Sequence, residues 1–226
     1  MFADYFTNHQ LLSSDRLAKL TELPEWDCQP QAVQLKQALR DLFERNEELL
    51  HNNPAEPQTK YYIISAVLHS LGFIYSINET VPIQDDTEVH VDFALFSTAE
   101  EFGEVEPTRG SATFFRPAPA LCQATNWGED LDLSDDPEIS AQQPVLLMDL
   151  FLRTTGVDYG IATNGQHWRL MSRTSPDPIS RYVETDLLKL LDGPIEAFQY
   201  LYLLFSRDSM TLDEDGNCFL NTLMAE

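Results

Sequence analysis

Residues 89–96 have the sequence Val-His-Val-Asp-Phe-Ala-Leu-Phe, in which the carboxylate of Asp92 stands among β-branched and aromatic residues. This composition predicts a β-strand. The pattern extends in both directions from it. Phe73–Ile77 predicts a strand before it, across an acidic loop around Asp85-Asp86, and Ala118–Thr125 predicts a third strand after it. Three successive strands therefore form the start of a sheet that contains Asp92.

The residues that follow predict a helix and then a hairpin. Val145–Thr154 has the composition of a helix that ends at Gly156, a residue suited to the left-handed C-terminal position. Tyr159–Thr163 and Gln166–Met171 read as two strands, and Asn164-Gly165 between them is typical of a two-residue turn. This order adds two strands to the sheet.

Apolar residues at helical spacing dominate the rest of the chain. The segments that show this spacing or a helix start signal are Arg16–Leu20, Gln31–Leu50, Thr59–Leu71, Tyr182–Leu191, Pro194–Ser206 and Phe219–Glu226. Glu100–Arg109, in contrast, is charged and is expected to be irregular. Helices before, between and after the strands predict an α/β fold with a mixed central sheet.

Charge and cysteine content limit the functions that the chain can have. The 226 residues include 37 acidic and 14 basic side chains, for a formal net charge of −23. Such a surface repels phosphate backbones, so the chain is not expected to grip DNA alone. The cysteines, at positions 28, 122 and 218, form no CxxC pair, which disfavours a zinc knuckle or a disulfide framework. We expect a soluble, cytoplasmic protein without membrane contact, because neither a signal peptide nor a long apolar run is present.

Several separate stretches share one specific pattern. They are Leu71-Gly72-Phe73, Val91–Phe96, Trp127-Gly128 with Leu131-Asp132, and the block from Thr155-Gly156 through Thr163-Asn164-Gly165 to Trp168-Arg169-Leu170. This pattern resembles the N-terminal nuclease domain of type IIG restriction–modification enzymes, which join a PD-(D/E)xK endonuclease to an adenine methyltransferase in one chain. The similarity continues into Phe198–Arg207 and so covers nearly the whole sequence.

The resemblance implies a restriction-endonuclease-like fold in three regions. Residues 1–58 would form a helical extension packed on the core, residues 59–175 the core itself, and residues 176–226 a set of C-terminal helices that lead to a following domain. A methyltransferase domain or subunit is the partner implied. The chain itself is not expected to methylate, because Asn53-Pro54-Ala55-Glu56 lacks the Asn-Pro-Pro-aromatic signature and no glycine-rich cofactor loop is present.

The catalytic motif of that family is incomplete in this sequence. An aspartate on one strand and a Glu-x-Lys triplet on its neighbour would hold Mg²⁺ and place a cation beside the attacking water. Asp92 matches the aspartate, but the triplet falls on Gln123-Ala124-Thr125, and the glutamine of the following helix falls on Leu147. Gln123 offers a neutral oxygen and Thr125 no cation. The catalytic positions Asp92, Gln123 and Thr125 therefore predict a degenerate site.

Two interpretations of Asp92 follow from this loss. Its carboxylate is either satisfied by nearby amides at the strand end, or it holds a metal weakly with the help of Glu88, Glu129 or Asp132. No cofactor is expected, and Mg²⁺ is the ion that a residual nuclease activity would need.

Three functions remain open from the sequence. The first is a degenerate nuclease fold kept as a scaffold or interaction module, which meets DNA only weakly or through a partner. The second is an active Mg²⁺-dependent endonuclease whose site is rebuilt by a displaced acidic residue. The third is an acidic DNA mimic, or a docking protein for a basic DNA-handling enzyme.

Overall fold

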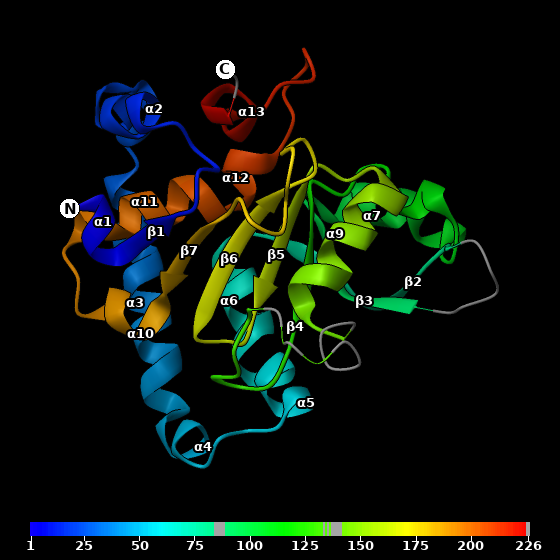
Figure 1. The fold of residues 1–226 in the computed structure, drawn as a ribbon, viewed down its shortest axis with the longest axis horizontal. Coiled ribbons are helices and arrows are strands. Elements are labelled where there is room, and N and C mark those ends of the chain that lie inside the picture. The colour runs from blue at the N-terminus through cyan, green and yellow to red at the C-terminus, as the bar shows by residue number, and fades with distance from the viewer. Residues whose placement is uncertain (84–88, 133, 135, 137–141, 225–226) are drawn as a thin grey trace.

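The structure, a computed structural model, describes residues 1–83, 89–132, 134, 136 and 142–224. One sheet of seven strands, in the order β1-β7-β6-β5-β4-β3-β2, forms the centre of the molecule (Figure 1). β4 and β5 run parallel, and the other neighbouring pairs run antiparallel. The strands are β1 Phe6–Asn8, β2 Ile74–Val81, β3 Val89–Phe96, β4 Ala120–Ala124, β5 Tyr159–Thr163, β6 His167–Ser172 and β7 Val183–Asp186.

Helices fill most of the remaining described chain. The α-helices are α1 Phe2–Tyr5, α2 Ser14–Lys19, α3 Gln29–Arg45, α4 Glu47–His51, α5 Glu56–Gln58, α6 Ser65–Ser70, α7 Ala99–Val105, α9 Pro144–Thr155, α10 Leu187–Leu191, α11 Ile195–Phe205, α12 Arg207–Met210 and α13 Phe219–Met224. A π-helical turn, Thr59–Ile64, joins α5 to α6. Short 3₁₀ turns cover Leu20–Glu22, Pro24–Trp26, Glu106–Thr108 and Ala112–Phe115.

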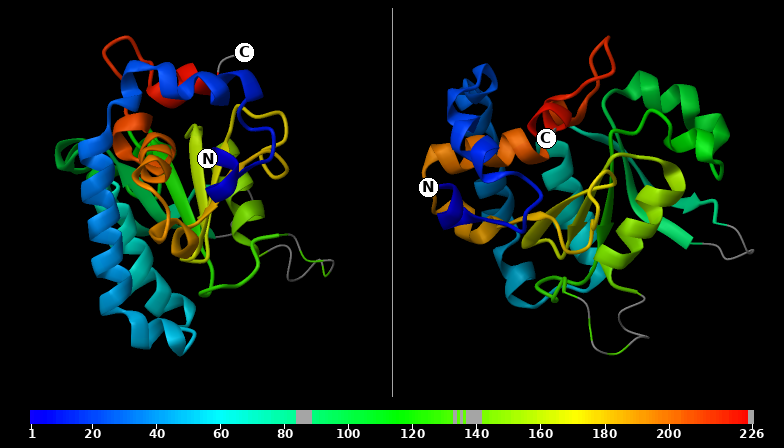
Figure 2. Two further views of the ribbon diagram at one scale, coloured as in Figure 1. Left: turned by 90° about the vertical axis from the view of Figure 1, so that its left-hand side faces the viewer. Right: turned by 45° about the horizontal axis from the view of Figure 1, so that its top comes forward.

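The sheet lies between two layers of helices, which the left view of Figure 2 shows edge-on. α3, α6 and α11 cover one face, and their apolar side chains form a core with alternate strand residues such as Phe93 and Cys122. α9 covers the other face and packs Met148 and Phe151 with Leu121 and the remaining strand residues. Because each strand sends successive side chains to opposite faces, one sheet supplies both cores.

Most of the expected elements are confirmed, and with them the α/β class with a mixed central sheet flanked by helices. β3 has the expected bounds, and α9 ends at Gly156, which has a φ of +80°. The expected helix Gln31–Leu50 is divided at Asn46 into α3 and α4. The loop expected around Asp85-Asp86 lies outside the described residues.

Three expectations are wrong. Glu100–Arg109 is not irregular, because a capping box between Thr98 and Glu101 starts α7 there. The expected helix Tyr182–Leu191 is strand β7 followed by α10, since its first residues pair with β6 and with β1.

The third error concerns the hairpin turn. Thr163 pairs with Trp168, not with Gln166, and three residues, 164–166, separate β5 from β6 instead of two. The side chain of Asn164 accepts hydrogen bonds from the backbone N–H of Gln166 and of His167, at 3.0 and 2.6 Å. This side-chain cap closes a longer loop than a two-residue Asn-Gly turn requires.

The N-terminal and C-terminal regions of the chain form part of the central sheet and of the helical layer on it. β1, from the first ten residues, is the edge strand next to β7. α3 packs along α11, and both contribute to the core that Phe93 shares. Among the described residues no helix is long and apolar enough to cross a membrane.

Candidate functional site

The strands β3 and β4 separate at Asp92. Their pairing runs from Leu95 opposite Ala120 to Phe93 opposite Cys122, and it stops there. One step further, side chains replace the backbone ladder. The N–H of Asp92 donates to Oε1 of Gln123 at 3.1 Å, and the N–H of Ala124 donates to Oδ2 of Asp92 at 2.8 Å. The predicted site residues Asp92 and Gln123 are therefore brought together, at the point where the strands diverge.

The alternation of faces along β3 also changes at this point. Val91 belongs to the core under α9, whereas Phe93, two residues later, belongs to the core under α6. Asn78, on the neighbouring strand β2, has a φ of +55°, and the flanking pairs Ile77–Phe93 and Glu79–Val91 place it across from Asp92. An asparagine tolerates this left-handed conformation better than most residues. The local distortion turns the Asp92 carboxylate toward the helical layer that carries Lys60.

Lys60 is the cation of the site. Its Nζ forms ion pairs with Oδ1 of Asp92 and with Oε1 of Glu56. The side chains of Asp92 and Lys60 are 11% and 23% exposed, so both charges are largely withdrawn from water. Both carboxylate oxygens of Asp92 are thus occupied, one by an ammonium group and the other by a backbone amide.

The helix geometry brings Lys60 to this position. Glu56 and Lys60 lie four residues apart, which places both on one side of a helix. Lys60 also lies within the π-helical turn, a type of local irregularity that is frequent at functional sites. Sequence reasoning missed this residue, although a signal was available: Lys60 is the sole lysine or arginine between Arg45 and Arg109.

The electrostatics of the cluster favour bound protons. Burial raises the pKa of Asp92, and the nearby Glu56 adds to the rise, while Lys60 and the Ala124 amide oppose it. Burial alone would lower the pKa of Lys60, but the two carboxylates outweigh it and the pKa is raised. Burial therefore decides the direction of the pKa shift for Asp92, and the two carboxylates decide it for Lys60.

The loop after β4 is linked to this cluster by hydrogen bonds. Thr125, the third predicted site residue, donates from Oγ1 to Glu129 at 2.6 Å, and Asn126 donates to the same carboxylate at 3.0 Å. These two hydrogen bonds lower the pKa of Glu129. Asn126 Oδ1 in turn accepts the backbone N–H of Glu56 at 2.8 Å, which ties this loop to the start of the helix that carries Lys60.

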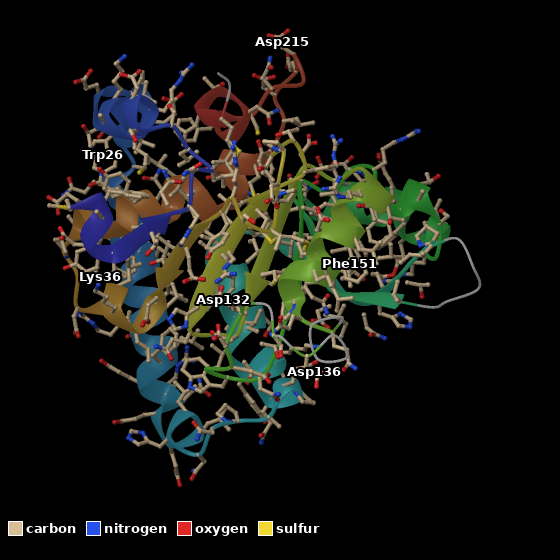
Figure 3. The ribbon with its side chains drawn as sticks, in the orientation of Figure 1. Trp26, Lys36, Asp132, Asp136, Phe151 and Asp215 are labelled. Atoms are coloured by element: carbon tan, nitrogen blue, oxygen red, sulfur yellow. The ribbon has the colours of Figure 1, made fainter. Side chains whose placement is uncertain are left out.

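The other candidates from the sequence lie elsewhere. Leu147 is on α9 and packs against the core of the opposite face. Asp132, labelled in Figure 3, accepts a hydrogen bond from Arg169 at 2.9 Å. Arg169 is buried, also bonds Glu184, and lies 3.9 Å from the ring centroid of Tyr182, so this group stabilises the fold. Glu88 lies outside the described residues.

The residues that surround Asp92 do not suit a resident Mg²⁺ ion. Gln123 contributes a neutral oxygen that is already bonded, and an ammonium group lies where a divalent cation would meet the carboxylate. Among the described residues, no group of three or more His, Cys, Asp or Glu is placed to hold a metal. Comparison with protein families, with curated proteins and with solved structures finds no match, so the geometry of this cluster must carry the functional argument.

Proposed function

We propose that this chain is a catalytically degenerate restriction-endonuclease-like module, of the kind that precedes the methyltransferase in type IIG restriction–modification proteins. It acts as a scaffold or interaction module in the cytoplasm rather than as a nuclease. The order of its elements supports this proposal: a helix, three antiparallel strands, the crossover helix α9 and a parallel strand, with Asp92 where β3 and β4 diverge.

The observation that carries the proposal is the ion-pair cluster of Asp92, Lys60 and Glu56. A nuclease of this type needs carboxylates that are free to bind a divalent cation. Here an ammonium group from the chain itself neutralises them. Lys60 thus acts as a permanent internal counter-ion, which keeps the diverging strands stable without metal.

The net charge of −23 agrees with a module that does not grip DNA alone. Its contact with DNA would be weak or would pass through a partner, and a methyltransferase domain or subunit is the partner that the sequence pattern suggests. No cofactor is required for such a role.

Calorimetric titration of Ca²⁺ and cleavage assays with Mg²⁺ or Mn²⁺ test this proposal. The unaltered chain should neither bind Ca²⁺ at this cluster nor cut DNA. Lys60→Met should create Ca²⁺ binding, because Asp92 and Glu56 then face each other without a counter-ion. Adding Asp92→Asn should abolish that binding, and Lys19→Met, at an exposed ion pair, should not create any. Cleavage by the unaltered chain would overturn the proposal.

One observation favours a second candidate, an active nuclease with a rearranged site. Lys60 beside Asp92 supplies the cation that Thr125 lacks, and Glu56 supplies a second carboxylate. In that case the unaltered chain cuts DNA with Mg²⁺, and Lys60→Met and Asp92→Asn each abolish the cleavage. The same assays therefore separate the two candidates.

A further inference from the structure

Two tyrosines directly after Lys60 project into solvent. The relative exposures of Tyr61 and Tyr62 are 74% and 47%, and their rings meet edge to face with centroids 4.9 Å apart. A side chain of this size usually packs at least one face of its ring against the fold. An exposed pair of aromatic rings is characteristic of a contact surface.

Ile77 is a third exposed side chain, on the sheet. It is 62% exposed and lies on β2, the strand at the edge of the sheet, opposite Phe93. Tyr75, two residues earlier on the same face, packs on Phe93 and on the core under α6. Ile77 therefore projects on the side of the sheet that carries Tyr61. We call Tyr61, Tyr62 and Ile77 the tyrosine patch.

The tyrosine patch is neutral, whereas the chain as a whole is strongly acidic. The run from Pro57 to Asn78 contains no Asp or Glu, although the chain has 37 such residues. Acidic side chains lie beside this run in the cluster already described, namely Glu56, and Glu129 with its neighbour Asp130 in the loop tied to Glu56. A charge-depleted aromatic centre with a charged rim is the composition of a protein interface.

We propose that the tyrosine patch docks a basic protein segment, whose apolar or aromatic side chains cover the three exposed residues while its Lys or Arg side chains meet the acidic rim. This proposal rests on the interaction role proposed above and names its partner chemistry. Charge complementarity selects this occupant, because a net charge of −23 repels both a second copy of the chain and a DNA duplex.

Selection from a random twelve-residue peptide library on phage, followed by affinity measurement of the enriched peptides with a fluorescent label, tests the proposal. The enriched peptides should combine Lys or Arg with aromatic or aliphatic residues, and their affinity should fall with added salt. Tyr61→Ser combined with Tyr62→Ser should weaken binding about tenfold or more, as loss of central aromatic contacts does. Val33→Ser and Leu212→Ser are matched controls, because these side chains are 50% and 56% exposed and lie outside the patch, and they should leave the affinity unchanged.

Several outcomes would overturn it. They are the absence of enriched peptides, enrichment of acidic or uncharged ones, or an equal loss in the control variants. Binding of a labelled DNA duplex that depends on the two tyrosines would instead make the surface a nucleic-acid platform. Self-association that the tyrosine substitutions abolish would make it a dimer interface. Cleavage of DNA with peptide binding intact would remove the proposed degenerate role but leave the docking surface in place.

Discussion

The backbone N–H of Asp92 donates a hydrogen bond to the side chain of Gln123 at 3.1 Å, one step beyond the last backbone pair between β3 and β4. Gln123 is 7% exposed and so bridges two diverging strands from inside the molecule. Gln123 thus has a structural role in this sheet. It satisfies a backbone group that the separating strands leave without a ladder partner.

Replacing either member of the ion pair between Lys60 and Asp92 should destabilise the fold. Lys60→Met should lower the free energy of unfolding by about 2 kcal/mol, because the largely buried carboxylate of Asp92 loses its counter-ion. Asp92→Asn should lower it by less, because Lys60 keeps its ion pair with Glu56. The double variant should lose less than the sum of the two, which a double-mutant cycle from urea denaturation measures. Lys19→Met, at an exposed pair with Asp15, should have little effect. Additive losses would contradict the pairing.

The stability that depends on Asp92 should change with pH in the acid range. Burial raises its pKa above the ordinary value of 3.8, so the folded chain holds this proton more tightly than the unfolded chain. The stabilisation of the folded chain by this proton is complete below about pH 3.8 and is lost as the pH rises through the raised pKa of Asp92. The unfolding free energy of the unaltered chain, minus that of Asp92→Asn, should therefore fall as the pH rises from the ordinary value of 3.8 through the raised pKa of Asp92. A difference that is constant over this range would contradict the burial of Asp92.

Gln123→Glu should destabilise the fold in EDTA by about 2 kcal/mol, because it buries a second carboxylate beside Asp92. Millimolar Ca²⁺ should restore part of the loss, since three carboxylates then surround the one ammonium group of Lys60 and leave negative charge for a cation to neutralise. Gln199→Glu is the matched control, because Gln199 is also buried but donates to the carbonyl of Trp26. It should be destabilised with no recovery in Ca²⁺. Thermal unfolding with and without the ion measures both, and recovery of both variants or of neither would contradict this geometry.

Arg169→Lys should lower the free energy of unfolding by about 2 kcal/mol, although the charge is kept, because a lysine cannot bond two carboxylates in a fork and stack on a ring at once. Arg169 bonds both Glu184 and Asp132 and stacks on Tyr182. Arg153→Lys should leave the unfolding midpoint unchanged, because Arg153 is exposed and pairs with Asp149 alone. Equal midpoints for the two variants would show that the buried fork contributes nothing.

Local sequence patterns did not predict the two strands β1 and β7 at one edge of the sheet. β1 has three residues, from Phe6 to Asn8, and β7 has four, from Val183 to Asp186. Segments this short give no period, and the residues after β7 have helical spacing, so the whole stretch Tyr182–Leu191 resembled a helix. Pairing with each other and with β6 makes these residues strands, and the pairing of β1 with β7 joins Phe6 to Thr185, a long-range contact that no local pattern contains.

The sequence by itself determined that Asp92 lies on a strand and that Gln123 and Thr125 stand on or beside the following strand. These conclusions depend on residue type and on local period, which a linear pattern contains. Only the tertiary structure decided what meets the Asp92 carboxylate, because Lys60 lies 32 residues away in the sequence. Packing of the helical layer on the sheet, rather than any local propensity, brings the Lys60 ammonium group to the Asp92 carboxylate. No local pattern indicates this contact.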